Sequence, residues 1–355
     1  MRAPRRILVH HPQEAAEYAR LIRLPRRGFE LAISSNAREA ADAIGETEIL
    51  YAWAFPPELL SRAPRLRWIQ NMGAGVERFL VPELAPEVVL TRAAGIFGPW
   101  MAEYTLGWAL WTTQNMERLR TQQRARQWHE VNPTPLRGTT LCVVGLGDIG
   151  RAIARAARAV GMVVVGVSRS GRHVREAHRV LRTSALRRAL AAADFVVLTV
   201  PLTEATRGLI GAPALAAMKP RAWLINIARG AVVDEAALVS ALRERRIGGA
   251  VLDVFTEEPL PATHPLWALD NAVITPHISG PSTPEEINPI FEDNLRRYLT
   301  RRPLRHVADR RVHVRFAEPA RGVEVALTRF VESIELGNEP RIRGQRIEAL
   351  APNGL

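Results

Sequence analysis

The sequence predicts a mixed α/β protein built from two domains, each a parallel sheet with helices on its faces. Short apolar runs alternate with helical or turn segments in two series, one before residue 100 and one after residue 138. A glycine-rich turn at residues 145–150 opens the second series. The chain has 355 residues and is 47% hydrophobic, which is enough to form two apolar cores.

The first series contains the expected strands Ile7–Val9, Glu30–Ile33, Ile49–Ala54, Leu66–Gln70 and Val88–Thr91. Pro99 then stands where a first helical turn begins, and residues 100–123 predict one long helix, since proline is tolerated in a first turn. Apolar positions of this helix include Trp100, Met101, Tyr104, Trp108 and Trp111. We expect its aromatic residues to pack between domains or subunits rather than to contact a ligand.

The second series follows a linker at Asn132–Gly138. Its expected strands are Leu141–Val144, Met162–Val167, Phe195–Val200, Trp223–Ile227, Gly249–Val254 and Ala272–Thr275, with helices over 152–160 and 235–243. A last helix within 282–300 is expected to begin with Asn288 as cap and Pro289 as first residue, because proline would break a helix interior. Since this helix follows the last strand directly, we expect it to pack back onto the first domain.

The turn after Leu141–Val144 has the spacing G-x-G-x-x-G in Gly145, Gly147 and Gly150. In such a turn one glycine permits the bend, one lets the backbone approach phosphates, and one lets the helix pack against the strand. The amino end of the helix then offers free N–H groups to an anion. The pattern predicts a dinucleotide site, although glycine turns between a strand and a helix also occur without a ligand.

The end of the next strand bears on the choice of cofactor. A carboxylate is expected there to hold the adenosine ribose, but the chain has Ser168, Arg169, Ser170, Gly171 and Arg172. Guanidinium groups can bind a 2′-phosphate, which a carboxylate would repel. The sequence therefore favours NADP(H), with NAD(H) as the possible alternative. The ordinary interpretation is that these arginines are solvated loop residues.

Composition bears on partners and location. The formal net charge is +12, yet Lys219 is the only lysine, and the arginine excess resembles codon bias more than a phosphate-binding face. Zinc-ligand spacing and a helix-turn-helix pattern are both absent from the sequence, so we expect no nucleic-acid partner. Apolar runs fall short of the roughly 20 residues that cross a bilayer, and the basic amino terminus enters a strand rather than a signal-peptide core. With Cys142 as the single cysteine, these features predict a cytoplasmic protein without a membrane partner.

Three segments of the second series end in side chains that can carry chemistry. The sequence NIARG places Arg229 after one strand, DVFTEEPLP places Glu258 after another, and TPHISG places His277 after a third. Ligands of open parallel sheets bind at the carboxyl ends of the strands, so the three side chains can converge there. Taken singly, each is more often an ordinary loop residue.

In these ordered motifs the sequence resembles the D-isomer-specific 2-hydroxyacid dehydrogenase family. The resemblance covers roughly residues 45–308 and includes VPLTEATRGLI, MKPRAWLINIARGAVVDEAAL, GGAVLDVFTEEPLP, HPLW and NAVITPHISG. It implies two Rossmann-like or flavodoxin-like domains with the cofactor and substrate cleft between them, and a homodimer. The substrate-binding domain would comprise residues 1–112 and 281–310, and the dinucleotide-binding domain residues 113–280. Residues 311–355 match nothing and are assigned no role.

The resemblance also implies an oxidoreductase that reduces a small 2-oxo acid to the D-2-hydroxy acid, with Arg229, Glu258 and His277 as catalytic residues. Histidine can donate a proton to the developing alkoxide near neutral pH. A neighbouring carboxylate, Glu258, favours the imidazolium form and orients the ring. The rigid fork of Arg229 suits a substrate carboxylate and can polarise the carbonyl. The alternative from another class is a non-catalytic dinucleotide-sensing protein on the same fold.

Other site residues follow from the resemblance and carry separate alternatives. The loop after Leu66–Gln70 would present N–H groups to the substrate carboxylate, with Trp53, Met72, Gly73 and Ala74 as substrate-binding residues. Trp53 favours a small substrate such as glyoxylate or hydroxypyruvate, although core packing is equally expected of it. Asp253 would accept a hydrogen bond from the nicotinamide carboxamide, or else would cap a turn. The expected cofactor-binding residues are Gly145, Gly147, Asp148, Ile149, Gly150, Ser168, Arg169, Ser170, Val200, Pro201, Thr206, Ile227, Ala228, Asp253, Ser279 and Gly280. No metal ligands are expected.

Overall fold

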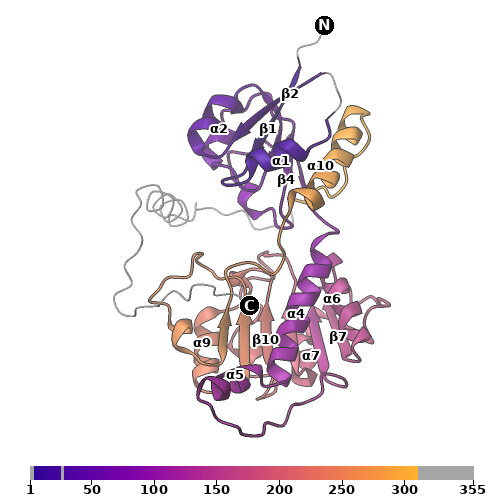
Figure 1. Cartoon of the computed structure of the whole chain (residues 1–355). Helices are drawn as coiled ribbons and strands as arrows, with labels where there is room; N and C mark the ends of the chain where they lie inside the picture. The colour runs from indigo at the N-terminus through magenta and orange to yellow at the C-terminus, as the bar shows by residue number, and fades with distance from the viewer. Residues whose placement is uncertain (1–3, 25–27, 311–355) are drawn as a thin grey trace, which may run out of the picture.

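The computed structural model describes residues 4–24 and 28–310 and contains two fully parallel sheets, each in its own α/β unit (Figure 1). The first unit has a five-stranded sheet in the order β2-β1-β3-β4-β5, and the second has a seven-stranded sheet in the order β12-β11-β10-β9-β6-β7-β8. The strands are β1 Arg5–His10, β2 Phe29–Ser34, β3 Thr47–Ala52, β4 Trp68–Asn71, β5 Val89–Arg92, β6 Thr140–Val144, β7 Val163–Ser168, β8 Arg179–Arg182, β9 Phe195–Leu198, β10 Trp223–Asn226, β11 Gly249–Leu252 and β12 Ala272–Ile274. The predicted mixed α/β class with two parallel sheets is confirmed, and β8 is an additional strand.

Helices connect and cover these strands. The α-helices are α1 Ala15–Leu21, α2 Ala37–Ile44, α3 Pro57–Leu60, α4 Phe97–Thr113, α5 Met116–Arg124, α6 Asp148–Ala159, α7 Leu186–Ala192, α8 Ala212–Leu215, α9 Glu235–Arg243 and α10 Pro284–Leu299. Short 3₁₀ turns are η1 Glu77–Phe79, η2 Thr183–Ala185, η3 Gly230–Val232 and η4 Pro265–Ala268. The helix expected at 235–243 is confirmed residue for residue, and Asp234 caps it by accepting the Ala237 N–H at 3.0 Å.

The apolar runs of the sequence become central strands that are buried on both faces. Strands β9 and β11 are buried at every position and β10 at all but Trp223, which explains why they are nearly continuous apolar stretches rather than alternating ones. One apolar cluster fills the outer face of each sheet, around Leu50 in the first unit and Leu224 in the second. A third apolar cluster extends from the inner face of the first sheet, through Phe97 and Met101 of the helix between the units, to the inner face of the second sheet.

The long helix predicted over 100–123 is two helices, and that prediction was wrong in its continuity. Helix α4 ends at Thr113 and α5 begins at Met116, because Asn115 adopts a left-handed conformation with φ 53°. Helix α4 lies along α6 of the second unit (Figure 1), where Gly98 lets it approach Ala152 closely. Trp111 contacts Trp223 edge-on, with ring centroids 6.1 Å apart.

The last helix begins earlier than the sequence predicted. Thr283 precedes α10 and Pro284 is its first residue, so Pro289 lies inside the helix and Asn288 is not its cap. Tertiary contacts outweigh the cost of the proline: the buried Asn288 side chain donates to Tyr18 O and accepts from the Tyr51 hydroxyl, at 3.0 and 2.9 Å. Phe291 stacks on Tyr51 with centroids 4.3 Å apart. The expected packing of this helix on the first unit is confirmed (Figure 1).

Candidate active site

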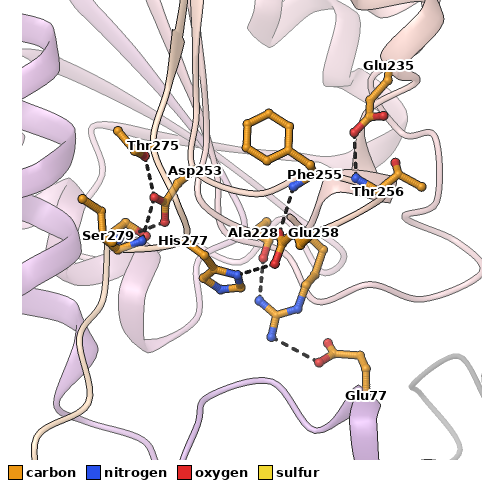
Figure 2. Close-up of polar contacts among 12 residues, drawn as sticks. Glu77, Ala228, Glu235, Asp253, Phe255, Thr256, Glu258, Thr275, His277 and Ser279 are labelled. Carbon is orange, nitrogen blue, oxygen red and sulfur yellow. Dashed lines mark hydrogen bonds and ion pairs between the residues drawn. The ribbon is translucent and has the colours of Figure 1, made fainter. Parts of the chain in front are cut away.

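The structure brings the three predicted catalytic residues together at the carboxyl ends of neighbouring strands. Strands β10, β11 and β12 are in parallel register, and Arg229, Glu258 and His277 follow them in that order. Figure 2 shows Glu258 and His277 facing one another, with Glu77 of the first unit opposite them. The cluster therefore lies between the two units.

His277 and Glu258 form a tight polar pair. The imidazole Nδ1 lies 2.8 Å from Glu258 Oε2, and the other carboxylate oxygen accepts the Phe255 N–H at 3.0 Å. The backbone of His277 is left-handed, with φ 55°, a strained conformation for a residue with a Cβ. This backbone conformation directs the imidazole toward Glu258, while the His277 side chain stays 40% exposed. The second ring nitrogen is thus open to a ligand.

Glu258 is held in its ionised form. Burial acts to raise the pKa of its carboxyl, but the hydrogen bond and charge of His277, the Phe255 amide and the Arg78 guanidinium together outweigh burial. The pKa of Glu258 consequently lies below its ordinary value. An ionised carboxylate facing Nδ1 accepts a hydrogen bond from that nitrogen and so orients the imidazole ring.

Arg229 is fixed by its own turn and by the opposite unit. The buried Asn226 side chain accepts the Ala228 N–H and donates to Arg229 O, each at 3.1 Å, which shapes the turn after β10. The guanidinium Nη1 donates to Ala228 O at 2.6 Å, and Nη2 donates to Glu77 Oε2 at 3.2 Å. Sequence reasoning missed Glu77, because nothing in the sequence indicates that η1 faces β10.

The loop after β4 is organised by Asn71. Its side chain accepts the Gly73 N–H at 3.1 Å and donates to the carbonyl oxygens of Gly73 and Gly75. The N–H groups of Ala74 and Gly75 have no acceptor within residues 4–24 and 28–310, so they are free for an anion. Trp53 is half-buried beside Gly73. Met72 is fully buried and donates its N–H to Ala52 O, so it packs beneath the loop.

The glycine turn has the geometry of a phosphate cradle. Gly145 adopts φ +104°, and a Cβ on Gly150 would overlap Gly145 O, so both positions require glycine. Gly147 faces open space, and the helix that follows it, α6, has no side-chain cap on its first N–H groups. The residues therefore fit a pyrophosphate at the amino end of α6. The Asp148 side chain points toward Gly95, since its Oδ2 accepts the Gly95 N–H at 2.9 Å.

At the end of β7, where the sequence lacks the expected carboxylate, the neighbouring side chains are arginines. The Ser168 hydroxyl accepts the Gly171 N–H at 3.2 Å, and Arg169 and Arg172 are exposed. Strand β8 adds Arg182, which pairs in register with Ser168 and packs against Gly171. In the described part of the chain, these arginines make no ion pair with a carboxylate. Arg182 was missed because β8 was not predicted.

The remaining predicted cofactor residues lie around the same sheet edge. Asp253 is fully buried and accepts from the Thr275 hydroxyl at 2.5 Å and from the Ile278 and Ser279 N–H groups at 2.8 and 2.9 Å (Figure 2). It thus caps the turn that carries His277. Thr206 donates to Pro201 O at 2.6 Å, which shapes the loop after Val200. Ile227 and Ala228 are buried, and Gly280 packs against Met101 of α4.

Two features of the described residues bear on other classes of protein. Among the residues that the structure describes, no group of three or more histidine, cysteine, aspartate or glutamate side chains could hold a metal ion. In the same residues, none of the helices has both the length and the apolar character needed to cross a membrane.

Comparisons with known proteins agree with this geometry. A family model described as "D-isomer specific 2-hydroxyacid dehydrogenase, NAD binding domain" matches residues 106–279. A (S)-sulfolactate dehydrogenase of Chromohalobacter salexigens is 38% identical over 256 residues, which cover 68% of this chain and 80% of that protein. A glyoxylate reductase of Aeropyrum pernix is 38% identical over 236 residues, which cover 63% of this chain and 70% of that protein.

Two solved structures share the arrangement of both units. A D-isomer specific 2-hydroxyacid dehydrogenase family protein from Aeromonas salmonicida has a TM-score of 0.81 and 38% identity, covering 87% of this chain and 100% of that one. An NADPH-dependent glyoxylate/hydroxypyruvate reductase from Sinorhizobium meliloti, solved with NADP and sulfate, has a TM-score of 0.80 and 27% identity, covering 88% of this chain and 99% of that one.

Proposed function

Because this chain belongs to the D-isomer specific 2-hydroxyacid dehydrogenase family, we propose that it reduces a small 2-oxo acid to the D-2-hydroxy acid with His277 as proton donor. Membership makes it an NAD(P)-dependent dehydrogenase or reductase. The observation that carries the proposal is the single cluster of Arg229, Glu258 and His277 facing the Asn71–Val76 loop of the other unit.

Each residue of the cluster has a distinct task in this reaction. A nicotinamide cofactor, when bound, would supply the hydride for this reduction. The Arg229 guanidinium binds the substrate carboxylate together with the free N–H groups of Ala74 and Gly75, and it polarises the carbonyl. The open ring nitrogen of His277 gives its proton to the developing alkoxide. Glu258 keeps the other nitrogen protonated and stabilises the ring's positive charge.

We propose glyoxylate or hydroxypyruvate as the substrate class. Trp53 lies beside Gly73 and narrows the loop that would receive the substrate, which favours a small acid. Relatives of this chain are named glyoxylate reductase, and another is named glyoxylate/hydroxypyruvate reductase A. Preference for a bulky branched or aromatic 2-oxo acid would contradict a small site.

For the cofactor we propose NADP(H) in preference to NAD(H). Arg169, Arg172 and Arg182 supply positive charge at the end of β7, and a carboxylate that would repel a 2′-phosphate does not follow that strand. Three similar solved structures contain NADPH or NADP. Arg182→Ala should lower the NADPH preference while leaving the reaction with NADH unchanged.

We further propose that residues 1–112 and 281–310 form the substrate-binding domain, that residues 113–280 form the dinucleotide-binding domain, and that the chain is a homodimer. Helix α4 presents the exposed Trp100 and Leu110, whose exposed fractions are 42% and 40%, and a second copy would cover such a face. Light scattering of the purified chain would test this, and a monomeric mass at micromolar concentration would exclude the dimer.

The test of the reaction is to follow NADPH and NADH consumption across a panel of 2-oxo acids. We expect turnover with glyoxylate or hydroxypyruvate, faster with NADPH. His277→Ala should lower turnover by several orders of magnitude while NADPH binding stays nearly intact. If no 2-oxo acid is reduced, or if His277→Ala keeps full activity, the proposed function is wrong.

A further inference from the structure

The contact that joins the two units at the catalytic cluster involves Glu77. This residue begins η1, immediately after the loop that would receive the substrate carboxylate. Its side chain is only 9% exposed, and its Oε2 lies 3.2 Å from Arg229 Nη2 (Figure 2). A carboxylate buried to this extent is costly without a partner, so Arg229 stabilises Glu77 as much as Glu77 restrains Arg229.

The ion pair leaves part of the guanidinium free. Arg229 uses one N–H on Ala228 O and one on Glu77, at opposite terminal nitrogens. Other N–H groups of the same fork, including Nε–H, have no acceptor among the described residues. The contact with Glu77 therefore fixes the plane of the guanidinium without occupying the fork that a substrate carboxylate would need.

The loop itself is shaped around this ion pair. A Cβ on Gly75 would overlap both the Arg229 guanidinium and the Glu77 carboxylate, so the guanidinium lies directly on the loop backbone. Asn71 draws in the carbonyl oxygen of Gly75, which holds the loop in this form. The free loop N–H groups and the free guanidinium N–H groups are thereby set at fixed positions relative to one another.

We propose that Glu77 is a positioning residue that aligns Arg229 with the loop N–H groups, so that both bind one carboxylate of the substrate. The inference rests on the proposed function, because it needs an anionic substrate at Arg229. It predicts the direction in which anion affinity changes when Glu77 is replaced. Glu77 is itself negative, so as a mere charge it would repel an anion, and its removal would tighten anion binding. As a positioning residue, its removal weakens anion binding.

Oxalate, a planar dicarboxylate, can serve as the probe in calorimetry on the protein saturated with NADP⁺. We expect Glu77→Gln to weaken oxalate binding by about tenfold, because a misaligned Arg229 would lose one charge-assisted hydrogen bond to oxalate. Glu77→Ala should weaken oxalate binding further. The KM for the 2-oxo acid should rise in the same order, while NADPH affinity stays unchanged. Glu87→Ala, an exposed glutamate of the same unit, is the matched control and should behave like the unaltered protein.

A double-variant comparison separates positioning from a general loss of structure. With Arg229→Ala in place, adding Glu77→Ala should cost no further oxalate affinity, because the residue it positions is gone. Additive losses, or tighter oxalate binding in Glu77→Gln, would overturn the inference while the proposed function stood. If the unaltered protein neither binds oxalate nor reduces a 2-oxo acid, the proposed function fails and the inference fails with it.

Discussion

Replacing Glu258 by glutamine tests the catalytic pair most directly, because the change is nearly isosteric. The carboxylate accepts from His277 Nδ1 at 2.8 Å and from the Phe255 N–H at 3.0 Å. In Glu258→Gln the amide oxygen can keep the Phe255 bond, which leaves the NH₂ group facing Nδ1. A neutral imidazole can accept that bond only with its proton on the other nitrogen, so the variant favours the opposite tautomer.

The expected loss follows from the contact that is removed. A hydrogen bond to a charged group contributes about 1.5–3 kcal/mol, and each 1.36 kcal/mol corresponds to about a tenfold change in rate. Loss of the charge that stabilises the imidazolium should therefore lower kcat for reduction by about ten- to a hundredfold, and the changed tautomer should add to this.

The assay is the initial rate of NADPH oxidation with glyoxylate, with NADPH binding measured separately by fluorescence. Unchanged NADPH affinity would show that the dinucleotide site is intact. A Glu258→Gln enzyme with the unaltered rate would refute the assigned role of this carboxylate.

Three further predictions concern stability and cofactor binding. Folding lowers the pKa of the Glu258 carboxyl below 4.5, so the ionised carboxylate stabilises the folded protein relative to Glu258→Gln. This difference in the free energy of unfolding should be complete above pH 4.5 and should shrink as the pH falls below 4.5, as measured by urea unfolding at several pH values. Gly150→Ala should abolish NADPH binding and lower the thermal midpoint, because the new Cβ would overlap Gly145 O. Tyr51→Phe should lower the free energy of unfolding by about 1 kcal/mol, since only its bond to Asn288 is lost, and equal urea midpoints would contradict this.

Much of the fold was predictable because parallel strands buried on both faces are mostly apolar. The elements that sequence reasoning missed depend on tertiary contacts instead. Pro289 is tolerated inside α10 because Asn288 and Phe291 anchor that helix to Tyr51 of the first sheet. Asn115 ends α4 through a left-handed turn that its neighbours do not signal. Strand β8 is short, exposed at both ends and rich in arginine, so it lacks the apolar pattern of the others.

The site divides in the same way. Arg229, Glu258 and His277 could be predicted to meet because each follows a strand of one parallel sheet. Glu77 could not, since its partner comes from a different sheet and depends on how the two units are placed. Asp253 illustrates a further difficulty, since a buried carboxylate near a ligand site can cap a backbone turn instead of binding a ligand. Only its contacts with Thr275, Ile278 and Ser279 show that it caps the turn.

The return of α10 to the first sheet affects how the protein is made. Strands β1 to β5 leave the ribosome long before residues 284–299, whereas the second sheet is complete by Ile274. Until α10 emerges, the nascent first sheet lacks Phe291, so Tyr51 and Trp68 are left uncovered on one side. The second unit therefore has its whole sheet before the first unit has α10, and the first unit can complete its apolar packing only when translation has passed residue 299.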